Sequence, residues 1–290
     1  QMYTMGTVLK HGTDEQKQKY LPHIATGELR LQAFGVTEPT TGSDTTQLKT
    51  RAERTESGSY IVNGQKTWTT LGQHANWIFC LVRTSKEGKR QEGISFLLID
   101  MATPGITVRP IYTLDGDHEV NEVFFDDVKV PVENLVGEEN KGFLVIMTNF
   151  NGERMAMAAG MEAMGRVCLE EAVQWAQERK TFGKRLADHQ VIRHKIAQMK
   201  QKLNATQAYI RICYESIEAG NASPGDIALL KVQASETMEF CAREAMQILG
   251  GIDYMRGNRV ERIYREVRVN AIGGGSEEIM RDLAVRQMGL

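Results

Sequence analysis

The spacing of apolar positions divides the chain into two parts with different periodicities. From about residue 31 to 132, short apolar runs alternate with glycine- and proline-containing turns, a pattern typical of β-strands. After about residue 142, apolar residues recur every three or four positions, as they do on one face of a helix. Since the strands come first and the helices follow, the order predicts an α+β chain in which a sheet domain precedes a helical bundle.

Four apolar runs define the expected sheet. Residues 60–64, YIVNG, join a β-favouring run to an Asn-Gly pair, the strongest local signal for a hairpin turn. Residues 77–83, WIFCLVR, and 94–100, ISFLLID, read as buried strands, and 122–126, EVFFD, as another. Together they predict one antiparallel sheet domain.

A long apolar stripe defines the first part of the bundle. Ile192, Ile196, Met199 and Leu203 are four, three and four residues apart, which places them on one face of a long helix. Val191 widens this stripe.

Turn-forming residues separate the later helices. The run NASPG at residues 221–225 ends the long helix, and further helices are expected over about residues 226–249, 260–269 and from 276 to near the C-terminus. Long helices joined by a short loop pack antiparallel in a bundle.

The first residues read as part of a helix that is already under way. Because Gln1 is not an initiator, we expect an N-terminal portion of the protein to be missing from this sequence. Thr13 can cap a second helix whose first turn carries Asp14 and Glu15, the charge that a helix N-terminus favours. The YLP run at residues 20–22 should end that helix or begin a new turn.

Composition excludes some classes of partner. The net charge of −2 gives no basic surface for nucleic acid. Neither a secretory signal nor an apolar run of about 18–20 residues, the length of a membrane span, is present. The four cysteines form no CxxC pair, so we interpret them as buried free thiols in a reducing compartment.

Two loops of the sheet part suit a heterocyclic ligand. Residues 34–44, FGVTEPTTGSD, offer hydroxyls and backbone amides that can cradle a ring edge or a pyrophosphate. Residues 63–72, NGQKTWTTLG, set an aromatic ring beside hydroxyls, which can pack on a flat heterocycle and bond its edge. Taken alone, ordinary turn residues explain the first run better, and a core tryptophan with turn threonines explains the second about as well.

Two further motifs lie in the helical part. Residues 178–184, ERKTFGK, with Gln190 shortly after, combine an arginine and a glycine that suit a phosphate, although a solvated charge run is the simpler local explanation. Residues 247–251, QILGG, read locally as a helix end with a glycine cap.

In this order and at these separations, the four motifs resemble the acyl-CoA dehydrogenase family. The resemblance covers about residues 10–290 and includes YLP at 20–22, VKVP at 128–131 and YRE at 264–266. It implies an N-terminal helical domain that is mostly absent here, a middle antiparallel β-domain and a C-terminal four-helix bundle. The corresponding ranges are 1–30, 31–134 and 135–290.

The resemblance also implies roles for single residues. The first loop would line the flavin and the acyl-CoA entrance, Trp68 and Thr70 would lie beside the isoalloxazine ring, and the bundle motifs would reach the FAD of a neighbouring subunit. The cofactor-binding residues implied are Phe34, Val36, Thr37, Gly42, Ser43, Trp68, Thr70, Arg179, Thr181, Phe182, Gln190, Gln247, Gly251, Ser276 and Glu278. Those implied for the substrate are Ser43, Phe150, Arg154 and Gly273.

One departure from the family pattern decides the catalytic base. Most members carry the base in a Tyr-Glu-Gly-Thr segment before the last helix, whereas the matching run here, IGGGSEEIM at residues 272–280, places Gly274 at that position. The long-chain and isovaleryl branches also lack that glutamate and take the base from the first bundle helix, where the matching residue is Glu153. Gly274 would then leave space for the Glu153 carboxylate. Glu277 and Glu278 are rival bases by proximity in sequence, but we expect them to point elsewhere.

The resemblance implies a full reaction. Glu153 would remove the α-proton of an acyl-CoA thioester, the β-hydrogen would pass to flavin N5, and the Gly274 amide would bond the thioester oxygen. Electron-transfer flavoprotein would accept the electrons from a homotetramer, a dimer of dimers, in a bacterial cytoplasm or the mitochondrial matrix. An acyl-CoA oxidase, a non-catalytic scaffold that kept the fold, and a heteromeric enzyme with a sister subunit are the alternatives.

Overall fold

The computed structural model describes residues 2–290, and Gln1 lies outside the described residues. The chain divides into two compact units, the first ending at Phe150 and the second comprising Asn151–Leu290. Each unit has its own hydrophobic core.

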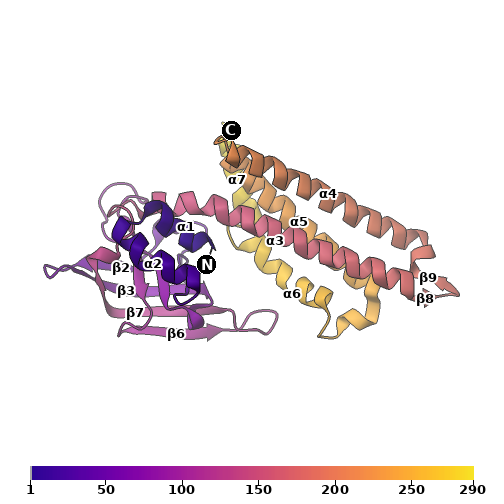
Figure 1. Cartoon of the computed structure of the whole chain (residues 1–290), viewed down its shortest axis with the longest axis horizontal. Helices are drawn as coiled ribbons and strands as arrows, with labels where there is room; N and C mark the ends of the chain where they lie inside the picture. The colour runs from indigo at the N-terminus through magenta and orange to yellow at the C-terminus, as the bar shows by residue number, and fades with distance from the viewer. Residues whose placement is uncertain (1) are drawn as a thin grey trace. The chain divides into compact units, whose positions relative to one another are not determined.

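Two helices precede the sheet in the first unit (Figure 1). They are α1, Met2–His11, and α2, Asp14–Thr26. The predicted cap of α2 is confirmed, because the Thr13 side chain accepts from the Gln16 backbone while the Gln16 side chain accepts in return from Thr13. The expectation for the YLP run was wrong, since α2 continues through Pro22 to Thr26 and ends at a left-handed Gly27.

A seven-stranded sheet follows, in the order β1-β4-β2-β3-β7-β6, with β5 paired to β4. The strands are β1 Leu31–Gly35, β2 Arg51–Arg54, β3 Ser59–Thr70, β4 Trp77–Arg83, β5 Ile94–Asp100, β6 Ile106–Ile111 and β7 Val120–Pro131.

The prediction of a purely antiparallel sheet was wrong, because β1 pairs with β4 in parallel and β2 adds a parallel bridge to β4. Apolar runs reveal that a strand is buried but not which distant strand is its partner. The partner of β1 lies beyond an intervening hairpin, so no local turn signals its direction.

The Asn-Gly hairpin was also misplaced. The turn between β2 and β3 lies at residues 55–58, and Gly64 is inside β3, where the pairing with β7 shifts register. A Cβ atom on Gly64 would lie 2.6 Å from the Cα of Thr50, so this glycine serves a close approach of two backbones rather than a turn.

Both faces of the central strand β4 are buried, which explains its unbroken apolar run. Ile78 and Cys80 pack into a cluster with β3 and β7, whereas Phe79 and Leu81 face a second cluster. That second cluster contains Val8, Tyr20 and Ile24, so α1 and α2 cover this face of the sheet.

Long helices build the second unit (Figure 1). The helix α3, Gly142–Glu178, begins in the first unit and a short β8–β9 hairpin, Lys180–Thr181 and Lys184–Arg185, follows it. The remaining helices are α4 Gln190–Glu218, α5 Pro224–Leu249, α6 Arg259–Ile272 and α7 Glu277–Gln287.

The predicted stripe on α4 is partly confirmed. Met199 and Leu203 are buried in the bundle core and Ile192 and Ile196 pack against it. Val191 is 60% exposed, so it does not widen the stripe. Among the described residues, no helix is long and apolar enough to cross a membrane.

Candidate active site

The loop after β1 is fixed by an ion pair in the interior of the first unit. The Lys66 ammonium lies 2.9 Å from the Glu38 carboxylate, and both side chains are buried. Lys66 also donates to the Val36 carbonyl, while Glu38 accepts from the backbone amides of Lys49 and Thr50. Burial alone would raise the pKa of Glu38, but Lys66 and these amides hold it below its ordinary value.

This ion pair connects the loop to β3, and a backbone bond from Thr67 N to Thr37 O adds a second connection. The predicted loop residues therefore lie alongside the strand that carries Trp68. Of these residues, Phe34, Val36 and Thr37 are half-buried, and Gly42 and Ser43 are exposed.

A bulge in β3 turns Trp68 toward solvent. The pairing with β7 shifts register between Lys66 and Thr69, and Trp68 adopts a φ of 60°, a left-handed conformation that costs a non-glycine residue free energy. The indole is 57% exposed, Thr70 is exposed, and Thr69 between them is buried. Trp68 and Thr70 thus share one face of the strand, an arrangement that fits a flat heterocycle with a polar edge.

Glu153 lies near the start of the second unit. One of its carboxylate oxygens, Oε2, is buried and has no hydrogen-bond partner. Burial raises the pKa of this carboxyl, and the neighbouring Arg154 opposes the shift. A buried carboxylate without a donor is a stronger base than one in water, because its charged form has lost hydration.

Arg154 and Met157 bring this turn of α3 to Gly274. The buried Arg154 guanidinium donates from Nε to the Gly274 carbonyl at 3.1 Å. Gly274 has a φ of +67°, and a Cβ atom there would lie 2.7 Å from the Met157 sulfur. Met157 therefore occupies the space that we had assigned to the Glu153 carboxylate, which corrects that detail of the expectation.

The two rival bases are held differently. Glu278 is exposed, and the first backbone amides of α7 together with Ser276 lower its pKa, which makes it a weak base. Glu277 accepts a hydrogen bond from Ser235 at 2.7 Å and lies near Arg281. Ser276 itself is the N-cap of α7.

The residues predicted to reach a neighbouring subunit's FAD gather at one end of the bundle. Arg179 follows α3, Phe182 in the β8–β9 turn is 97% exposed, and Gln190 begins α4. The ion pair of Lys195 with Glu244 places the first turns of α4 beside the last turns of α5, which carry Gln247 and lead to Gly251. Thr181 is half-buried near His189. Phe150, at the end of the first unit, packs against that unit's core.

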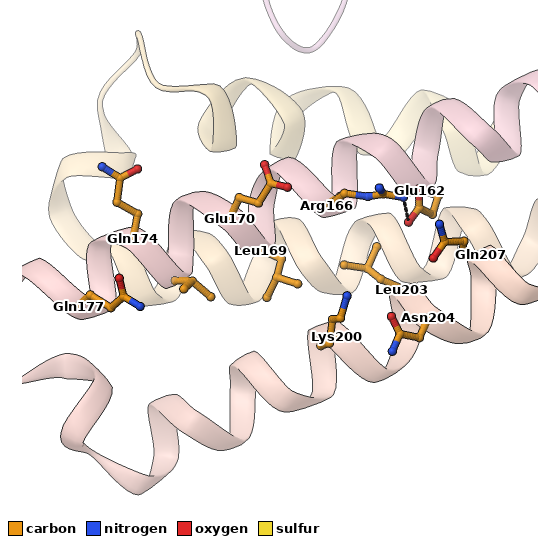
Figure 2. A pocket seen from close by; sticks show the side chains of 11 residues that line it. Glu162, Arg166, Leu169, Glu170, Gln174, Gln177, Lys200, Leu203, Asn204 and Gln207 are labelled. Atoms are coloured by element: carbon orange, nitrogen blue, oxygen red, sulfur yellow. Dashed lines mark hydrogen bonds and ion pairs between the residues drawn. The ribbon is translucent and has the colours of Figure 1, made fainter.

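A cavity of about 440 Å³ lies elsewhere, between α3 and α4 (Figure 2). Glu162 and Arg166 form an ion pair at 2.7 Å on its wall, and Lys200 lines it from α4. None of the predicted site residues lines this cavity. Within residues 2–290, no group of three or more His, Cys, Asp or Glu side chains is placed to hold a metal ion.

Three residues outside the predicted roles contribute to these sites, namely Lys66, Met157 and Lys231. Lys231 donates from Nζ to the Gly275 carbonyl at 2.8 Å. Lys66 and Lys231 carry a sequence signal, because each is a single cation at a position where the pattern predicts burial, as in IALLKV at residues 227–232. Met157 carries none.

Comparisons with known proteins are consistent along the whole chain. The family models for the N-terminal, middle and C-terminal domains of acyl-CoA dehydrogenases match residues 1–28, 33–128 and 140–289. A protein from Alternaria alternata named acyl-CoA dehydrogenase AFT10-1 is 41% identical over 97% of this chain and 67% of its own length. The mouse mitochondrial long-chain specific acyl-CoA dehydrogenase is 32% identical over 98% of this chain and 66% of its own. The crystal structure of acyl-CoA dehydrogenase from Geobacillus kaustophilus superposes with a TM-score of 0.95 at 35% identity, covering 98% of this chain and 75% of that one.

Proposed function

This chain belongs to the acyl-CoA dehydrogenase family, and on that premise we propose that it desaturates an acyl-CoA thioester between Cα and Cβ, giving a trans-2-enoyl-CoA. FAD, when bound, supplies the redox chemistry by accepting the β-hydrogen with its electron pair. The side chains of this protein bind and orient the reactants and move the α-proton.

Glu153 is the base that takes the α-proton. The observation that carries this assignment is its buried carboxylate oxygen, which has no hydrogen-bond partner and is therefore available to a proton from carbon. Burial raises the pKa of Glu153, which makes its carboxylate a stronger base, while the charge of Arg154 favours the ionised form. The neighbouring Arg154 holds the Gly274 carbonyl, so the same turn of α3 orients the loop whose amide would bond the thioester oxygen.

The residues present fit the cofactor. Trp68 and Thr70, exposed together on β3, would hold the isoalloxazine ring, and the loop from Phe34 to Ser43 would line its edge and the acyl-CoA entrance. Groups at the end of the bundle, all exposed except the half-buried Thr181, would hold the adenosine-diphosphate part of an FAD that a neighbouring copy binds. They are Arg179, Thr181, Phe182, Gln190, Gln247 and Gly251.

The assembly is a homo-oligomer. Besides Val191, α4 exposes Ile212 and Tyr214, and large apolar side chains on one exposed helix are typical of subunit contacts. Electron-transfer flavoprotein is the electron acceptor, and a reducing compartment, the cytoplasm or the mitochondrial matrix, suits four buried, unpaired cysteines.

Anaerobic flavin bleaching tests the function. The holoenzyme is mixed with straight, branched and cyclic acyl-CoAs, and absorbance reports flavin reduction. Glu153→Gln should retain FAD and acyl-CoA and reduce the flavin about 10²- to 10⁴-fold more slowly, since a positioned base contributes about that much. Glu162→Gln makes the same change nine residues further along α3 and should leave the rate of flavin reduction unaltered.

The outcomes separate the alternatives. A protein that binds no FAD supports the scaffold, and peroxide formed with the product supports an oxidase. A nearly normal rate in Glu153→Gln would refute the assignment of the base.

A further inference from the structure

A fully buried lysine contacts the loop of residues 273–276, which joins α6 to α7. Lys231 of α5 has no exposed surface, and its ammonium donates to the Gly275 carbonyl at 2.8 Å. Burying an ammonium group is costly unless other groups compensate it. Burial lowers the pKa of Lys231 to about 8, Glu277 and Glu278 from α7 oppose that shift, and Arg154 from α3 adds to it.

Arg154 holds the preceding carbonyl, that of Gly274, at 3.1 Å. Two cations from two different helices thus hold the carbonyl ends of successive peptides. No peptide bond among residues 2–290 is cis, and in a trans peptide the N–H points opposite to the C=O. The amides of Gly275 and Ser276 are therefore turned away from the two cations.

Apolar side chains also pack against the loop. Gly274 and Gly275 both have positive φ, and added Cβ atoms would meet the side chains of Met157 and Met280 respectively. At its start the loop is anchored by Gly273 N donating to Val269 O at 2.7 Å. The loop is consequently fixed both by polar contacts and by close packing.

We propose that Lys231 is a positioning residue for the dehydrogenation: it holds the Gly273–Ser276 loop through Gly275 and places a positive charge behind the site where the thioester enolate forms. This inference rests on the proposed function. Lys231 does not touch the substrate. It acts through the backbone of Gly275, and together with Arg154 it lowers the energy of negative charge that develops on the thioester oxygen.

The test compares Lys231→Met, which keeps an unbranched side chain as far as Cε but removes the charged ammonium, with Lys231→Arg, which keeps the charge. Flavin reduction by a saturating acyl-CoA is followed in the holoenzyme between pH 6 and 10. Losing a direct oxyanion donor costs about 10²–10³-fold, so this indirect contact should cost roughly 30-fold in Lys231→Met, with little change in the half-saturating substrate concentration. Lys231→Arg should recover most of that loss.

The pH profile separates positioning from a structural role. The wild-type rate should fall as the pH rises through about 8, where Lys231 loses its charge. Lys231→Met should lack this fall because it has no group to titrate, and Lys231→Arg should lack it because arginine stays protonated. Lys200→Met is the matched control: it removes another bundle lysine, which is exposed and lines the cavity between α3 and α4, where none of the predicted site residues lies. It should retain the wild-type rate and profile.

Several results would overturn the inference. One is a rate of flavin reduction in Lys231→Met equal to that of the wild type, and another is a pH profile in either variant that still shows the fall near pH 8. Where the variants do not fold, a rate of the wild-type protein that stays constant up to pH 10 would overturn it. A wild-type protein that no acyl-CoA bleaches refutes the proposed function itself, whereas bleaching that is insensitive to Lys231 refutes only this role.

Discussion

The contact between Gly274 and Met157 makes a quantitative prediction about the free energy of unfolding. In Gly274→Ala, the new Cβ would lie 2.7 Å from the Met157 sulfur, at a residue whose φ is +67°. The left-handed conformation costs an alanine about 1–2 kcal/mol relative to glycine. Overpacking against Met157 adds only about 1 kcal/mol, the low end of such penalties, because the atoms met are the end of a flexible, half-buried side chain that can turn aside. The expected loss is therefore about 2–3 kcal/mol.

A double-mutant cycle separates these two parts. In a Met157→Ala background, Gly274→Ala should cost only the backbone part, so the coupling between the two sites should be about 1 kcal/mol. Urea unfolding followed by helical circular dichroism at a fixed, saturating FAD concentration measures each free energy. The control is Gly160→Ala on α3, the helix that carries Met157. An added Cβ at Gly160 has no neighbour within 4 Å, so this change should stabilise the protein slightly. Additivity of Gly274→Ala and Met157→Ala within about 0.5 kcal/mol would refute the packing account of Gly274.

Three further predictions concern other parts of the site. Because burial raises the pKa of Glu153 above its ordinary 4.5, the contribution of this carboxyl to stability is present below pH 4.5 and is lost as the pH rises through the raised pKa. Glu153→Gln should therefore unfold at a higher urea concentration than the wild type at pH about 8 and lose that advantage toward pH 4.5. Equal urea midpoints of the two proteins at both pH values would contradict this. Lys66→Met leaves the Glu38 carboxylate buried without its cation and should lower the free energy of unfolding in urea by about 3–5 kcal/mol. Adding Glu38→Gln should recover part of that loss, and a double variant as unstable as Lys66→Met would argue against a stabilising ion pair. Trp68→Ala should weaken FAD binding in a fluorescence titration by about 2- to 10-fold, since an aromatic pair is worth about 0.5–1.5 kcal/mol. The free energy of unfolding should change little because the indole is 57% exposed, and an unchanged FAD affinity would remove Trp68 from the flavin site.

The family resemblance and the order of sheet and bundle were predictable because periodicity and motifs are local or keep their order along the chain, and both are confirmed. Helix ends were predicted within a few residues where caps mark them, as at Thr13 and Ser276. The strand partners were not predictable, because apolar runs such as that of β4 show burial on both faces but not the neighbour in the sheet. The Asn-Gly pair misled for the opposite reason: its glycine serves a backbone contact with Thr50, which is distant in sequence.

In the candidate site, too, the type of a residue could be predicted from the sequence, whereas its partner in space could not. The departure at Gly274 could be recognised from the sequence because a glycine cannot act as a base, and it directed attention to Glu153. The group that fills the space beside Gly274 could not be recognised, since Met157 is one of many apolar residues on α3 and only the packing of the loop against that helix singles it out. Glu153, Arg154 and Met157 lie within five successive positions of one helix, so little more than one turn would supply the base, the cation that holds the loop and the side chain that packs against Gly274. A glutamate at position 274 would place its Cβ 2.7 Å from the Met157 sulfur at a left-handed backbone position, so a glycine in the loop and Met157 on α3 fit each other, as the proposed base on α3 would require.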